Sequence, residues 1–112
     1  MVNFVERESL QKKLSKPKKV RLIYAKALGK GKVRIIWKWF VNQDGFQLQY
    51  AQNRGFTKKK KTLRKSKHTN IVTLKKLKRG KTYYFRVRAY NKSGSKKKYG
   101  KWSNVKKIKI KK

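Results

Sequence analysis

The sequence predicts an all-β protein, a seven-stranded antiparallel β-sandwich in one domain. The first observation behind this prediction is a strict alternation over residues 83–90. Its two faces carry Tyr83, Phe85, Val87 and Ala89 on one side and Tyr84, Arg86, Arg88 and Tyr90 on the other. A period of two is typical of a strand with one buried and one wet face. The second observation is that turn signals such as Asp44-Gly45 and Arg79-Gly80-Lys81 separate short runs of this kind. The third is the length, since 112 residues suffice for one modest core.

The N-terminal part indicates a tail followed by an edge strand. Residues 1–16 are polar and are expected to form a tail or linker, so the folded domain is expected to span residues 17–112. Pro17 disfavours a continuing helix, because the residue before a proline avoids the helical region. Residues 20–25 then predict an edge strand, where a leading proline is tolerated.

The next segments predict two core strands followed by a cationic run. Residues 32–40 alternate again, and Trp37 is expected to be the core tryptophan. After a loop over residues 42–45, residues 46–50 predict a third strand. The charge run Lys58, Lys59, Lys60, Lys61 is interpreted as an irregular edge or a solvated loop.

The C-terminal half predicts a corner, a central strand and a last strand. Residues 71–74 predict a short strand that returns before Leu77 and the turn that follows it. The central strand over residues 83–90 leads into a hairpin-like loop over 91–101, and residues 105–110 mark a final strand.

Charge is the most extreme property of the chain. It has 37 Lys+Arg against 3 Asp+Glu, a formal net charge of +34. Repulsion of this size opposes compaction unless counterions or a polyanion lie nearby. The alternative is that the lysines only solubilise exposed strands and protect sheet edges from aggregation.

The residues needed for catalysis or for a metal site are nearly absent. The acids are Glu6, Glu8 and Asp44, and none can pair with another across a substrate inside the sandwich. The sole histidine, His68, is expected in an exposed loop. The chain has no cysteine, so thiolate chemistry is excluded. We therefore expect a protein that is not an enzyme and that needs no cofactor or metal.

Several motifs are similar to those of a known family. Val33, Ile35 and Trp37 match one of its strands, Phe46, Leu48 and Tyr50 the next, and Leu77, Tyr83, Val87 and Ala89 its corner and following strand. Gly100-Lys101-Trp102-Ser103 with Val105 matches the entry to its last strand. Over residues 17–112 the chain resembles fibronectin type III domains, which have an immunoglobulin-like sandwich. It is most similar to the lysine-rich type in surface or secreted proteins of Gram-positive bacteria. The resemblance implies that Tyr83 is a corner tyrosine whose hydroxyl bonds to backbone upstream.

A flat, cationic and aromatic face is the first candidate binding site. It would carry Tyr84, Arg86, Arg88, Tyr90, Gln47, Gln49, Lys107 and Lys109. Its cations would pair with phosphate, sulfate or carboxylate, and its tyrosines would stack on sugars or bases. The alternative is an ordinary solvated sheet face. A second set of candidate contacts lies in loops, at Lys96, Lys97, Lys98 and Tyr99 and at Lys58, Lys59, Lys60 and Lys61.

Two classes of function remain open. The first is a non-catalytic spacer or adhesion module of a bacterial cell-surface or secreted protein, held by charge to anionic polymers such as teichoic acid and acidic glycans, or to other protein chains. The second is a basic nucleic-acid-binding protein, consistent with a pI of ≈ 11.1. A monomer without membrane insertion is expected, because no apolar run reaches the length of a membrane span. An extracellular or cell-surface location would need an export signal outside this sequence, since residues 1–16 lack one. The alternative location is cytoplasmic.

Overall fold

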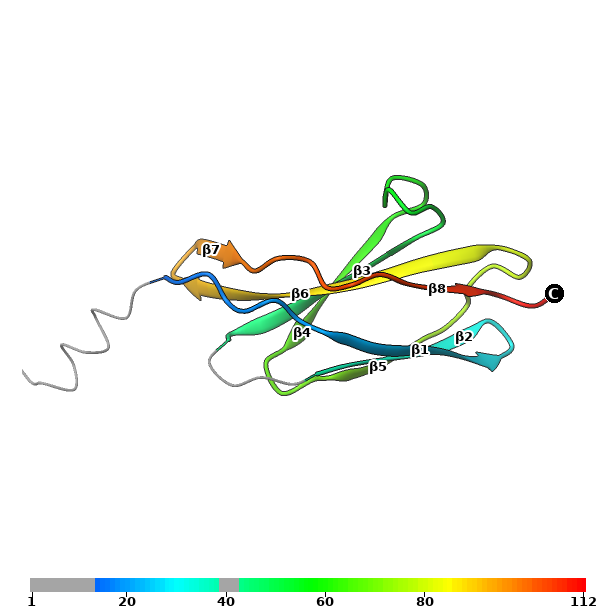
Figure 1. Cartoon of the computed structure of the whole chain (residues 1–112), viewed down its shortest axis with the longest axis horizontal. Helices are drawn as coiled ribbons and strands as arrows, with labels where there is room; N and C mark the ends of the chain where they lie inside the picture. The colour runs from blue at the N-terminus through cyan, green and yellow to red at the C-terminus, as the bar shows by residue number, and fades with distance from the viewer. Residues whose placement is uncertain (1–13, 39–42) are drawn as a thin grey trace, which may run out of the picture.

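The computed structural model of the chain describes residues 14–38 and 43–112, and it shows two antiparallel sheets packed face to face (Figure 1). The smaller sheet has the strand order β1-β2-β5. In the larger sheet β4, β3, β6 and β7 are neighbours, and β8 also pairs with β6. The strands are β1 (Leu22–Gly29), β2 (Lys32–Trp37), β3 (Gly45–Ala51), β4 (Lys61–Ser66), β5 (Ile71–Leu74), β6 (Thr82–Ser93), β7 (Lys96–Tyr99) and β8 (Lys106–Lys109). The predicted all-β sandwich is confirmed, with 8 strands in the described residues where the sequence led us to expect seven.

One strand that the sequence did not reveal is β4. It begins at Lys61, at the end of the charge run, and pairs along its length with β3. Only Leu63 of this strand packs against the core. An edge strand is held by backbone hydrogen bonds on one side and needs no apolar face, so its sequence carries no alternation to detect.

The segment predicted as a hairpin-like loop is a regular hairpin. The central strand β6 continues to Ser93, and β7 pairs with it from Tyr90↔Tyr99 to Ser93↔Lys96. The first strand is shifted along the chain from its predicted range of 20–25. It begins at Leu22 and continues to Gly29, four residues beyond the predicted end. Residues 39 and 40 of the second predicted strand lie outside the described residues.

The core lies between the inward faces of the two sheets. The Trp37 side chain is 0% exposed, and its ring meets that of Phe46 edge to face, with centroids 5.4 Å apart. The inward residues of β6 that the alternation predicted, Tyr83, Phe85, Val87 and Ala89, are all buried. Because side chains alternate along a strand, burial of this set turns Tyr84, Arg86 and Arg88 to the outer face of the larger sheet.

Candidate functional site

The outer face of the larger sheet brings the predicted face residues together. Strand register places Gln47 opposite Arg88 and Gln49 opposite Arg86. On the other side of β6, Lys107 of β8 lies opposite Tyr84, and Lys109 lies opposite Thr82. The residues proposed from sequence therefore share one face.

The segment between β7 and β8 brings Trp102 to this face. Gly100 donates its N–H to the carbonyl of Ala89 (2.9 Å), and Ser103 donates its N–H to that of Val87 (2.8 Å). The Ser103 hydroxyl accepts a third bond, from the Val87 N–H at 2.9 Å. These bonds fix the segment beside β6 where no regular strand forms.

The loop after β3 brings a second aromatic ring to the face. The side-chain oxygen of Asn53 accepts hydrogen bonds from the N–H groups of Thr57 and Lys58, each at 2.9 Å. Inside this turn Phe56 adopts a left-handed conformation with φ of 54°, which costs about 1–3 kcal/mol for a residue other than glycine. The Phe56 ring is nevertheless only 3% exposed, because the turn folds it back over the sheet.

Together these elements form an alternating stack of aromatic rings and guanidinium groups, which we call the arginine stack. Its members in contact order are Phe56, Arg86, Trp102, Arg88 and Tyr99. The guanidinium carbon of Arg86 lies 4.0 Å from the Phe56 ring centre and 4.1 Å from that of Trp102. That of Arg88 lies 4.2 Å from Trp102 and 3.9 Å from Tyr99. Each guanidinium group therefore contacts two aromatic rings, whose electron-rich faces attract its positive charge.

Two glutamines complete the environment of the arginines. The Arg88 Nε–H donates to the side-chain oxygen of Gln47 at 2.7 Å. Arg86 donates through both Nε (2.8 Å) and an Nη to the oxygen of Gln49, whose own amide donates to the Thr62 hydroxyl at 3.2 Å. The glutamine amides thus hold the two guanidinium groups in the positions where the rings cover them.

Burial has an electrostatic consequence for both arginines. Desolvation, and then repulsion by Arg88, lower the pKa of Arg86. Desolvation also lowers the pKa of Arg88, while Tyr99 acts in the opposite direction. Both groups keep their charge near neutral pH, because the ordinary pKa of a guanidinium lies far above that range.

The corner before β6 contains the hydrogen bond that the resemblance implied for Tyr83. Its hydroxyl accepts a bond from the N–H of Lys78 at 2.8 Å and another from the Gln52 amide at 3.2 Å. Leu77 is buried beside it and donates its N–H to the carbonyl of Gly31 at 3.0 Å. The corner is therefore tied both to β6 and to the turn between β1 and β2.

The family profile of the fibronectin type III domain matches residues 15–106. The chain belongs to the fibronectin type III family. In general these domains are non-catalytic binding or spacer modules.

Solved structures support the same fold. Similar structures include the FN1–FN3 domains of chicken CNTN1, with a TM-score of 0.73 at 20% identity over 86% of this chain and 33% of that one. The FN5 domain of Drosophila Lar has a TM-score of 0.68 at 16% identity, covering 86% of this chain and 98% of that one. The fn3 domain of human contactin 1 has a TM-score of 0.67 at 16% identity, covering 80% and 73%. No curated protein sequence matches the chain.

Within this fibronectin type III domain, the candidate face is only partly open. Gln49 and Tyr90 are 7% and 6% exposed, and Tyr84, Arg86 and Arg88 are half-buried. Sequence reasoning missed Phe56 and Trp102, which cover the arginines. Neither belongs to an alternating run, so no periodic signal placed them on this face.

The candidate loop contacts separate into two places. Lys96, Lys97 and Lys98 are exposed on β7, whereas Tyr99 is part of the arginine stack. Lys58, Lys59 and Lys61 border an open hollow of ≈ 520 Å³ between the loop after β3 and the corner before β6. We call it the lysine hollow; its cationic lining is Lys58, Lys59, Lys61, Lys75, Lys76, Lys78 and Lys81.

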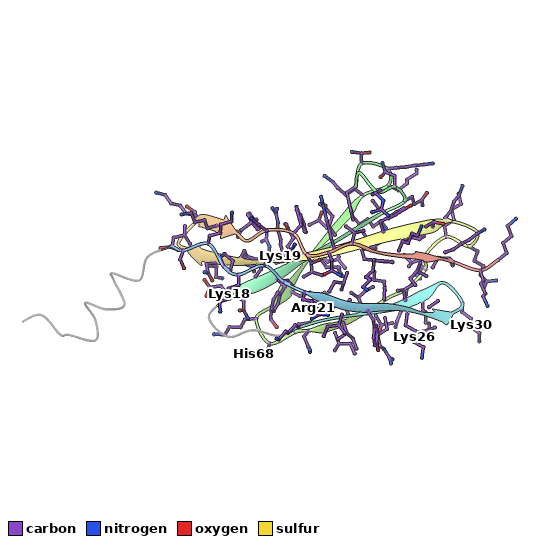
Figure 2. All side chains as sticks on the ribbon, in the orientation of Figure 1. Lys18, Lys19, Arg21, Lys26, Lys30 and His68 are labelled. Carbon is purple, nitrogen blue, oxygen red and sulfur yellow. The ribbon has the colours of Figure 1, made fainter. Side chains whose placement is uncertain are left out.

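The remaining candidates for chemistry are dispersed. His68 is exposed in the loop between β4 and β5 (Figure 2). Within residues 14–38 and 43–112 no three His, Cys, Asp or Glu side chains gather as metal ligands would. The same residues include no helix with the length and apolar character needed to cross a membrane.

Proposed function

We propose that this fibronectin type III domain is a non-catalytic module of a bacterial cell-surface or secreted protein, and that it binds anionic polymers by charge. The observation that carries the proposal is the imbalance of 37 basic against 3 acidic residues. Since the polymers of cell surfaces include polyanions, a module of this charge would be attracted to them, most strongly within about one Debye length, which is about 8 Å at physiological ionic strength.

The distribution of charge over the described residues supports the proposal. Basic side chains extend outward from both sheets and from the loops (Figure 2). Asp44 is the one acid in the described part of the chain, and its carboxylate accepts a hydrogen bond from the N–H of Lys92 at 2.8 Å. Acidic side chains of the described residues thus compensate almost none of the positive charge.

The outer face contributes charge in two different ways. Lys107 and Lys109 are exposed and their side chains are long enough to follow a polymer. Arg86 and Arg88 carry the same charge, but aromatic rings cover both guanidinium groups, and some of their donors already bond to Gln49 and Gln47. We therefore assign the lysines the direct contacts and the arginines a contribution to the field.

The alternative of nucleic-acid binding has less support from this geometry. Proteins that bind single strands stack bases on exposed aromatic faces. Here Arg86 lies over the rings of both Phe56 and Trp102, and Arg88 lies over Tyr99. Attraction to nucleic acid would consequently be electrostatic and would not depend on the nucleotide sequence.

The test is salt-dependent retention on columns carrying teichoic acid, a heparin-like glycan, DNA or RNA, with uncharged dextran as the reference matrix. We expect retention at 150 mM salt on the anionic glycan and teichoic acid columns. The double variant Lys107→Gln/Lys109→Gln is expected to elute at lower salt than the wild type. The proposal would be overturned if the protein left the anionic columns as early as it leaves the dextran column. Retention on the DNA or RNA column alone would also overturn it.

A further inference from the structure

The lysine hollow gathers positive charge from segments that are distant in the sequence. One wall is the loop after β3 with the first residue of β4, and the other is the connection between β5 and β6. All of its lysines are exposed, so each ammonium group can turn into the hollow. No carboxylate belongs to the lining.

The floor of the hollow supplies neutral hydrogen-bonding groups. It consists of Tyr50, Gln52, Leu77 and Tyr83. Because the Tyr83 hydroxyl already accepts two bonds, from Lys78 and Gln52, its own proton remains to be donated. The rings of Tyr50 and Tyr83 are only 8% and 6% exposed, so they offer no flat surface for stacking a base.

Both walls are held in place by the fold. In the first wall, Phe56 anchors the loop through the arginine stack, and Lys59 is left-handed with φ of 53°. In the second, Lys76 is left-handed with φ of 59°, and Gly80 donates its N–H to the carbonyl of Ile110 at 2.7 Å. Strained backbone that persists in this way is fixed by its surroundings and is concentrated at functional sites.

Among the described residues, no acidic side chain lies near the hollow. Asp44 is bonded to Lys92, at the end of β6 away from Tyr83. At about 3.3 Å per residue along a strand, the two ends lie roughly 30 Å apart. This separation is several times the Debye length of about 8 Å at physiological ionic strength. An anion in the hollow would therefore relieve repulsion that no acidic side chain of the described residues neutralises.

We propose that the lysine hollow binds the phosphate or sulfate groups of an anionic polymer. The inference rests on the proposed function and gives it a specific place in the fold. Ammonium groups act as point charges and accept either tetrahedral oxyanion. The hydroxyls of the floor add donors, and the lack of a stacking surface leaves bases unrecognised.

The experiment compares two variants that remove the same charge. Lys59→Gln/Lys76→Gln/Lys78→Gln removes three lysines from the hollow, and Lys96→Gln/Lys97→Gln/Lys98→Gln removes three from β7. Calorimetric titration at 150 mM salt would use inorganic tripolyphosphate as the phosphate probe and a sulfated heparin oligosaccharide as the sulfate probe. We expect the hollow variant to lose at least tenfold in affinity for the preferred probe, and the β7 variant less than threefold.

The outcomes separate the two proposals. Equal losses in the two variants would overturn the hollow as a site while leaving the proposed function intact. A wild-type protein that binds neither probe and no anionic column would overturn both. The preferred probe identifies phosphate or sulfate as the natural chemistry, and tighter binding to DNA than to both probes would contradict the inference.

A second measurement does not depend on the variants being folded. In the wild-type protein, tripolyphosphate should shift the NMR signals of the Gln52 side-chain amide and of the Lys78 backbone amide. The amides of Lys96 and Lys97 should move much less. Shifts spread evenly over both regions would indicate diffuse attraction and would contradict a site.

Discussion

The ring centre of Trp102 lies 4.1 Å from the guanidinium carbon of Arg86, and the same ring also contacts Arg88. A cation–π contact contributes about 0.5–2 kcal/mol. We therefore predict that Trp102→Ala lowers the free energy of unfolding by about 2–4 kcal/mol. Urea denaturation would measure it, with Lys101→Ala, at an exposed neighbour, as the control. Equal midpoints for the two variants would mean that the shared ring does not stabilise the domain.

Replacing an arginine of the stack by lysine should destabilise the domain even though the charge is kept. Arg86→Lys loses the planar group that both stacks on Phe56 and donates to Gln49. The expected loss is about 1–2 kcal/mol, again measured by urea denaturation. Because shape and not charge is lost, the difference from wild type should persist in 1 M salt. A difference that disappears at high salt would show that only charge mattered.

The corner bond of Tyr83 gives a prediction for local and global stability. Tyr83→Phe removes the acceptor of the Lys78 N–H and of the Gln52 amide. A polar group left without its partner costs about 1–3 kcal/mol. Thermal unfolding would report the loss, and hydrogen exchange at the Lys78 amide should accelerate. An unchanged exchange rate at that amide would contradict the structural role of the hydroxyl.

The environment of Tyr50 predicts that the stability of the fold falls at alkaline pH. Burial, and then the neighbouring Tyr83, raise the pKa of Tyr50 in the folded protein. The unfolded chain then releases this proton at lower pH than the folded chain, so the contribution of Tyr50 to stability is lost as pH rises above about 10.

The matched measurement for Tyr50 compares wild type with Tyr50→Phe at each pH. Lysines also titrate in this range, and the comparison cancels their effect. The stability of the wild type relative to the variant should fall between pH 9 and pH 12. A constant difference over that range would refute the raised pKa of Tyr50.

The net charge predicts that salt stabilises the fold. The Debye length falls from about 30 Å at 0.01 M to about 3 Å at 1 M ionic strength, so repulsion among charges summing to +34 is screened. The Tm should therefore rise with sodium chloride. Lys96→Gln/Lys97→Gln/Lys98→Gln, which lowers the charge by three, should show a shallower rise. A Tm that falls with salt would indicate that attractive ion pairs dominate.

Much of the fold was predictable because it depends on local alternation. The inward set of β6 and the burial of Trp37 follow from residue types spaced by two along a strand. A strand without an apolar face, such as β4, shows no alternation in its residues, since its pairing depends on the backbone.

The amino-acid sequence by itself determined that the chain folds as a sandwich with aromatic residues inside, and that its surface is overwhelmingly positive. Only the tertiary structure decided which cationic side chains are covered by aromatic rings and which remain exposed. It brings Phe56 and Trp102, from two separate loops, onto Arg86, and it gathers the lysines of two other segments around Tyr83. The physical reason is that alternation is a property of one strand, whereas a stack or a hollow requires side chains whose proximity is created by loops and strand register.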